Sequence, residues 1–188
     1  MSTASMAQGT ALPVPLPWSG LLALSTAAFT AVMTELLPAG LLPEMAPALG
    51  VPEARIGFLV TAYAAASFAA AIPLTALLRG LPRRPVLVGA LLGFAVSDAV
   101  VALSSSYALT FGARLVAGCT GGLLWAMLVG YAARMVPAER RGRAIAVVLA
   151  GITLALSLGV PAGTALAGAM GWRTAFGVLA GLAVLLVG

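Results

Sequence analysis

The stretch that decides the fold is Val86-Leu-Val-Gly-Ala-Leu-Leu-Gly-Phe-Ala-Val-Ser-Asp-Ala-Val-Val-Ala-Leu103, an apolar run with one charged residue, Asp98. A helix needs about 20 mainly apolar residues to cross a hydrocarbon core about 30 Å thick. Further runs of this kind lie on both sides of it. Together they predict six membrane-spanning helices, over residues 18–37, 56–78, 86–103, 108–133, 144–170 and 172–188. The sequence therefore indicates an all-α integral membrane protein.

The composition supports this fold class and excludes several functions. Apolar residues make up 62% of the chain, charged residues only 8%, and the mean hydropathy is +1.11. Soluble domains carry about a quarter charged residues. The chain has no His, and its single Cys is Cys119. We therefore expect a protein within the lipid bilayer, with no metal site, no cofactor and no catalytic residues, because an intramembrane enzyme would need a nucleophile and base that the sequence does not offer.

The arginines predict the orientation. Seven arginines lie in the loops after the second and fourth spans, against two on the other side: Arg79, Arg83, Arg84, Arg134, Arg140, Arg141 and Arg143 against Arg55 and Arg173. Basic loops stay in the cytoplasm. We expect a multi-pass protein of the inner (plasma) membrane with both termini cytoplasmic, residues 1–17 as a cytoplasmic segment and 18–188 as the transmembrane domain. Short arginine clusters between apolar runs do not indicate a nucleic-acid partner.

Two segments echo each other. Ile72-Pro-Leu-Thr-Ala-Leu77 in the second span is similar to Val160-Pro-Ala-Gly-Thr-Ala-Leu166 in the fifth. Proline-interrupted helices at matching places indicate two inverted three-helix repeats of a transporter. Small residues at four-residue spacing predict close helix packing. They are Gly118/Gly122, Gly159/Gly163, Gly177/Gly181 and Ala62/Ala66/Ala70.

Several motifs carry a family resemblance, in this order along the chain: Thr34-Glu-Leu-Leu-Pro-Ala-Gly-Leu-Leu-Pro43, Leu81-Pro-Arg-Arg-Pro85, Arg114-Leu-Val-Ala-Gly118, Pro137-Ala-Glu-Arg-Arg-Gly-Arg-Ala144, Gly159-Val-Pro-Ala-Gly-Thr164 and Gly171-Trp-Arg173. Over residues 18–188 the chain resembles the N-terminal six-helix half of the major facilitator superfamily, in its drug:proton antiporter and sugar-efflux branch.

Two of the family's motifs are only partly present. The cytoplasmic gate motif G-x-x-x-D-R-x-G-R-R keeps Arg83 and Arg84, while Arg79 replaces its Asp. The antiporter motif of the fifth helix keeps Gly159, Pro161 and Gly163. The resemblance thus implies an antiporter with an altered cytoplasmic gate.

Three charges lie at membrane depth, where they are costly and usually functional. Counting about 1.5 Å per residue from the cytoplasmic face places Glu35 about 26 Å deep, Arg114 about 28 Å and Asp98 about 18 Å. We expect Glu35 to carry a proton and to face Arg114, for which the resemblance implies a part in proton transfer; the alternative is a pair that only braces two helices. Asp98 is a third candidate for proton coupling, but the resemblance implies for it a peripheral helix that usually carries Asn, so a structural role is favoured and Asp98→Asn should be nearly silent.

The implied function is proton-coupled efflux of a small drug- or sugar-like molecule. Trp125, Met127 and Tyr131 are candidate substrate contacts, with packing or interfacial anchoring as the alternative. The family works with twelve helices, so we expect a second six-helix half as partner. A truncated or regulatory membrane protein without transport of its own is the competing hypothesis.

Overall fold

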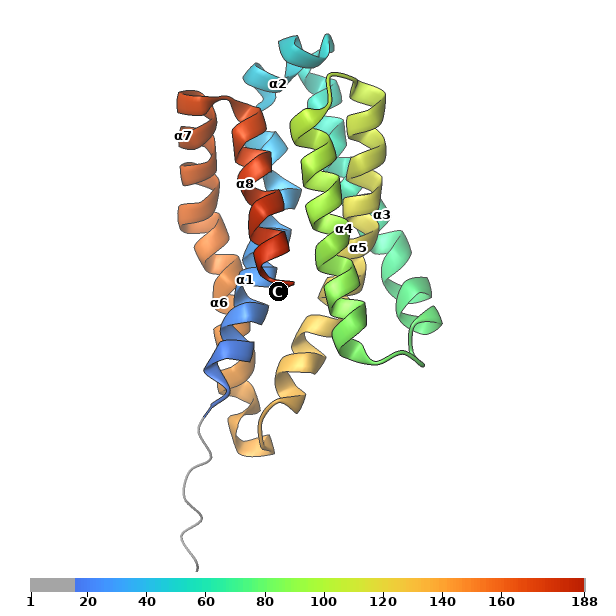
Figure 1. The fold of residues 1–188 in the computed structure, drawn as a ribbon, viewed down its shortest axis with the longest axis vertical. Coiled ribbons are helices and arrows are strands. Elements are labelled where there is room, and N and C mark those ends of the chain that lie inside the picture. Colours follow the sequence, from blue (N-terminus) through green and yellow to red (C-terminus); the bar gives the residue numbers. More distant parts are fainter. Residues whose placement is uncertain (1–15, 188) are drawn as a thin grey trace, which may run out of the picture.

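The computed structural model describes residues 16–187, and within that range the chain is helical with no strand. The elements are α1 (Trp18–Gly40), α2 (Leu42–Leu49), α3 (Glu53–Leu77), α4 (Arg83–Leu103), α5 (Tyr107–Arg134), η1 (Ala138–Arg140), α6 (Arg141–Leu154), η2 (Ala155–Gly159), α7 (Val160–Met170) and α8 (Trp172–Leu185). The long helices run side by side in one bundle (Figure 1). The all-α prediction is confirmed.

Among the described residues, five helices are long and apolar enough to cross a membrane: α1, α3, α4, α5 and the continuous segment Ala138–Met170. The sixth predicted span corresponds to α8, which has 14 residues. Such a helix is about 21 Å long, shorter than a hydrocarbon core, and residue 188 lies outside the described range. Six membrane spans thus remain a prediction, as do the cytoplasmic placement and boundaries of residues 1–17, of which 1–15 also lie outside that range.

The bundle has two distinct ends (Figure 1). One end holds α2 together with the α4–α5 and α7–α8 connections, and we call it the α2 end. The other end holds the start of α1 and the α3–α4 and α5–α6 connections, and we call it the arginine-rich end. It carries Arg79, Arg83, Arg84, Arg134, Arg140, Arg141 and Arg143. The sequence did not predict α2, a short helix that ends at Gly50 in the left-handed conformation (φ 65°).

Small residues let α3 and α5 approach closely. A Cβ atom at Gly118 or Gly122 of α5 would collide with the main chain of Tyr63 or Ser67 in α3. The same applies to α6 and α1, where Gly151 faces the main chain of Ser25. Glycine is therefore required at these crossings, as the spacing of Gly118 and Gly122 predicts.

The other glycine pairs differ from one another. Gly159 and Gly163 face side chains of α1, among them Met33. Around Gly177 and Gly181, by contrast, no neighbouring atom of the described chain lies within 4 Å of a Cβ position. Close packing at the predicted glycines therefore holds in the fifth span but not at Gly177 and Gly181 of α8.

The fifth span is continuous but not uniform. It changes from α-helix to a π-helical turn at η2 and then returns to α-helix. Pro161 follows directly after this turn, and a proline cannot donate the usual main-chain hydrogen bond and crowds the preceding turn. A wider turn accommodates the proline without ending the helix.

Candidate functional site

Four helices bring five polar residues together, which we call the polar cluster. They are Thr34 and Glu35 of α1, Tyr63 of α3, Asp98 of α4 and Arg114 of α5. All except Glu35 are 0% exposed, and Glu35 is about half-buried. Arg114 is among the largest fully buried side chains of the described residues. Because an uncompensated buried charge is costly, its partners decide what the cluster can do.

Arg114 binds the main chain of α1. Its Nη1 donates a hydrogen bond to the carbonyl oxygen of Thr34, and its Nη2 donates to that of Glu35 at 3.0 Å. In an α-helix the Thr34 carbonyl would accept from the N–H four residues later, but that residue is Pro38. Proline has no N–H, so the Thr34 carbonyl lacks its helical donor. The guanidinium supplies the missing hydrogen bond.

Asp98 binds the side chain of the same residue. The Thr34 hydroxyl donates a hydrogen bond of 2.7 Å to Asp98 Oδ2. Among the described residues, Asp98 Oδ1 and Arg114 Nε have no hydrogen-bond partner. Thr34 therefore contacts both buried charges, the carboxyl through its hydroxyl and the guanidinium through its carbonyl.

Tyr63 closes the cluster on the α3 side. The Arg114 guanidinium carbon lies 4.7 Å from the centre of the Tyr63 ring, a cation–π contact. The phenol fits beside Gly121 of α5, where a Cβ atom would collide with it. The Tyr63 hydroxyl is buried and has no partner within the described residues. Aromatic and main-chain contacts thus compensate a charge that would otherwise be isolated.

The structure brings the three predicted charges together but differs in detail from what the sequence indicates. Arg114 reaches α1 at Glu35, yet it bonds the Glu35 main chain, not its carboxylate. Asp98 lies inside the bundle at the level of Thr34, not at a peripheral site closer to the arginine-rich end. The predicted span begins at residue 86, but α4 begins at Arg83. These three additional residues place Asp98 about 4.5 Å further from the arginine-rich end.

The candidate substrate contacts and the arginines of the gate motif are not gathered in one site. Tyr131 and Arg84 line a cavity of about 470 Å³ between α1, α4 and α5. Met127 and Arg83 line a separate recess of about 160 Å³ with Arg79. Trp125 packs against buried apolar residues instead. Trp125, Met127 and Tyr131 thus share no single cavity, and contact with substrate stays a prediction.

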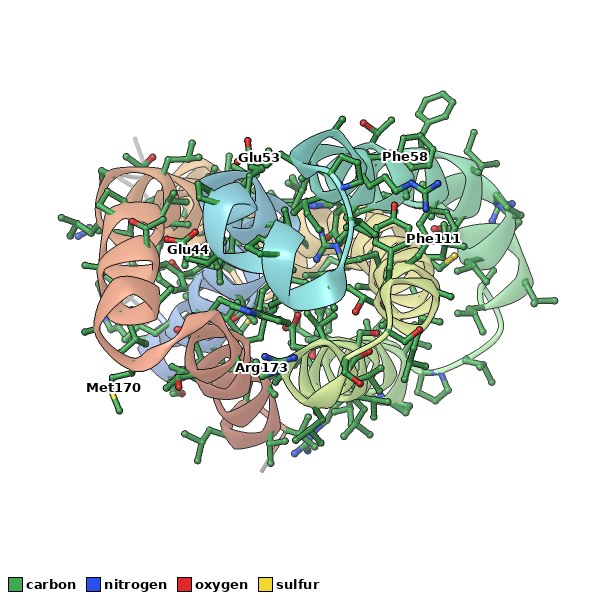
Figure 2. All side chains as sticks on the ribbon, turned by 90° about the horizontal axis from the view of Figure 1, so that it is seen from above. Glu44, Glu53, Phe58, Phe111, Met170 and Arg173 are labelled. Atoms are coloured by element: carbon green, nitrogen blue, oxygen red, sulfur yellow. The ribbon has the colours of Figure 1, made fainter. Side chains whose placement is uncertain are left out.

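The α2 end carries exposed aromatic and charged groups (Figure 2). Phe58 and Phe111 stack with ring centres 6.0 Å apart, which joins α3 to α5. Arg173 of α8 donates a hydrogen bond of 3.0 Å to the Ser104 carbonyl at the end of α4. Glu44 and Glu53 also lie at this end and are exposed. These contacts join helix ends, and the polar cluster lies beneath them.

Comparison with known proteins adds the family context. The sequence profile of the Major Facilitator Superfamily matches residues 24–188. A chloramphenicol resistance protein of Streptomyces lividans is 38% identical over 167 residues, which cover 89% of this chain and 42% of the relative. A chloramphenicol efflux pump of Mycobacterium tuberculosis is 36% identical over 172 residues, with the same coverage of both chains. An uncharacterised transporter of Bacillus subtilis is 34% identical over 84% of this chain and 40% of the relative. The chain spans about two-fifths of the length of these relatives.

Proposed function

This chain belongs to the Major Facilitator Superfamily, and on that premise we propose that it serves as a six-helix half of a proton-coupled efflux transporter. The observation that carries the proposal is the polar cluster: a fully buried arginine with two acidic side chains beside it, inside apolar helices. Charges at this depth are expensive and typically mark ion or proton pathways. We assign proton coupling to Glu35 and Arg114, because Glu35 is partly accessible while Arg114 is held against α1.

For the transported molecule we propose a drug-like compound of the chloramphenicol type. The support is the naming of two relatives, one as a chloramphenicol resistance protein and one as a chloramphenicol efflux pump. A sugar-like substrate is the alternative from the motif resemblance. The structure contributes the low polarity of the helices around the cluster, which suits an apolar molecule better than a sugar.

The helix pairing supports two inverted three-helix repeats. The closest pairs include α3 with α5 and α1 with α6, while α4 pairs with α8. An inverted repeat has a two-fold axis that exchanges the first, second and third spans with the fourth, fifth and sixth. Such an axis would exchange the pair α3–α5 with the pair α1–α6, and it would leave the pair α4–α8 unchanged. This pattern is typical of transporters that rock around a central site.

A second six-helix unit is the proposed partner. In α3 and in Ala138–Met170, only 28% of the apolar membrane-spanning stretch is buried inside the bundle, against 61% in α1. Their uncovered surface is available to lipid and to another half. The support for a second half is the length of the relatives, which exceeds this chain by more than a factor of two.

For the membrane orientation, we propose that both termini are cytoplasmic. The distribution of arginines between the two ends supports this assignment. A reporter fused after Arg140 should read cytoplasmic, and one fused after Ser105 should read external. The reverse pair of signals would reject this orientation.

Transport by this chain together with a second six-helix half tests the function. Everted membrane vesicles with an imposed pH gradient should take up chloramphenicol, and uptake should stop when a protonophore collapses the gradient. Uptake that persists without the gradient would reject proton coupling. No uptake at all, from protein shown to be folded, would favour the competing hypothesis of a membrane protein without transport of its own.

A further inference from the structure

Three buried polar atoms of the cluster lack hydrogen-bond partners within the described chain: Asp98 Oδ1, Arg114 Nε and the Tyr63 hydroxyl oxygen. Buried polar groups are nearly always paired, so an unpaired set in one place needs an explanation. One of these atoms belongs to Arg114 itself, Tyr63 contacts its guanidinium, and the Asp98 carboxyl interacts electrostatically with it. Such a set fits a site whose hydrogen bonds change between two states.

We propose that Asp98 is a second proton site and that Thr34 couples its protonation to the hydrogen bonds between Arg114 and α1. The position of α1 would then depend on whether Asp98 carries a proton. The inference rests on the proposed function for its role in transport. It departs from the family resemblance, which favours a structural role for Asp98. Thr34 acts here as a positioning residue, because it works through the two charges on either side of it.

The first step concerns the hydroxyl of Thr34. A carboxylate only accepts hydrogen bonds, and Asp98 Oδ2 accepts the one that the Thr34 hydroxyl donates. A protonated carboxyl carries an O–H and becomes a donor, for which the same hydroxyl is an acceptor. Protonation therefore reverses the bond between Asp98 and Thr34. The proton comes from a hydronium ion of the surrounding water, whose O–H bond breaks as the carboxyl O–H forms, and deprotonation returns the proton to water.

The second step concerns the guanidinium. When Asp98 is ionised, it attracts the buried cation; when it is neutral, that attraction is lost and the α1 carbonyls hold the cation alone. The Thr34 carbonyl depends on Arg114 because Pro38 cannot supply an N–H. A change in the charge of Asp98 thus affects Arg114, the residue that donates a hydrogen bond to the Thr34 carbonyl in place of the missing N–H of Pro38.

The other charged or titratable groups near Asp98 set its surroundings. Glu35 of α1 and Tyr63 of α3 are in the cluster, and both interact with Arg114. On α8, which packs along α4, Arg173 lies at the α2 end and bonds the Ser104 carbonyl. Glu35 is the accessible member and Asp98 the enclosed one. Glu35 is thus placed to exchange protons with water. Asp98 is placed so that its own charge affects the contacts of Arg114 and Thr34 within α1.

Infrared spectroscopy of this chain together with a second six-helix half, in lipid vesicles, tests this link. Protonated carboxyl groups have a C=O stretching band that appears in difference spectra between two pH values. We expect a band that Asp98→Asn removes and Glu35→Gln leaves in place. Thr34→Val, which keeps the shape but not the hydroxyl, should move this band to higher frequency and shift its pH midpoint, while Thr34→Ser should restore both.

The control is Ser97→Ala, which removes the neighbouring buried hydroxyl, one without a partner in the described chain, and should leave the band unchanged. A band that survives Asp98→Asn, or one that Thr34→Val does not move, would overturn the inference. Thr34→Val retains shape and keeps the test valid if Asp98→Asn fails to fold. The spectra need no transport. Expected spectra without pH-driven chloramphenicol uptake would reject the proposed function and leave the proton site standing.

Discussion

The polar cluster and the arginine-rich end carry charge in opposite ways. In the polar cluster, Asp98 and Arg114 are fully buried and their hydrogen bonds go to α1. At the arginine-rich end, Arg83, Arg84 and Arg134 are exposed. Exposed charges in water contribute little to stability but direct membrane insertion, whereas buried charges are costly and depend on each partner. The same residue type is thus exposed at the arginine-rich end and fully buried in the cluster.

The largest effect should come from Arg114→Ala. The variant leaves the Thr34 carbonyl without a donor and the Asp98 carboxyl without its cation, so we expect a loss of about 3–5 kcal/mol in the free energy of unfolding. Arg134→Ala, near the other end of the same helix, should change it by less than about 0.5 kcal/mol. Denaturant unfolding in lipid bicelles measures both. Equal effects of the two substitutions would contradict the difference between the buried arginine and the exposed one.

Thr34→Val should have the second largest effect. It removes the hydroxyl that binds Asp98 but keeps the carbonyl that binds Arg114. A hydrogen bond to a charged group contributes about 1.5–3 kcal/mol, and the same unfolding assay should show a loss in that range. Ser97→Ala, at a buried hydroxyl without a partner in the described residues, should cost clearly less. A larger loss at Ser97 would contradict the assigned role of Thr34.

The smallest effect on stability should come from the arginine-rich end, where the consequence is topological. Replacing Arg141 and Arg143 with Ala removes two exposed charges from the start of α6. We expect little change in unfolding, because each site is exposed, but a measurable fraction of chains with the reporter after Arg140 on the external side. Unchanged topology together with strong destabilisation would show that these arginines are structural.

Much of this arrangement could be predicted from the sequence. Glu35, Asp98 and Arg114 stand out because each is a charge within an apolar run, and the long helices follow from run length. The bounds of α1 and α4 differ from the predicted ones by three residues at one end each. The family assignment, carried by motifs such as Arg114-Leu-Val-Ala-Gly118, is confirmed.

The rest depends on pairings between distant segments. Thr34 and Tyr63 are uncharged residues of a kind common in spans, and only the fold shows that both contact Arg114. Pro38 leaves the Thr34 carbonyl without its helical donor, and only the fold shows that the Arg114 guanidinium bonds this carbonyl instead. The hydrogen bond between Thr34 and the buried Asp98 likewise joins two helices far apart in the sequence, so the sequence alone does not reveal it. The short helix α2 contains Pro47, a residue that usually argues against a helix, and it has no long apolar run to reveal it.

The proposed coupling of protons to transport depends on a carboxylate beside Arg114. Its most direct measurement compares Glu35→Gln with Glu44→Gln in this chain together with a second six-helix half, by chloramphenicol transport against an imposed pH gradient together with equilibrium binding. Glu35→Gln keeps the shape and hydrogen-bonding groups but cannot ionise, so pH-driven transport should fall to that of vesicles without the protein while binding persists. The exposed Glu44 should be replaceable without effect. Normal pH-driven transport by Glu35→Gln would contradict the claim.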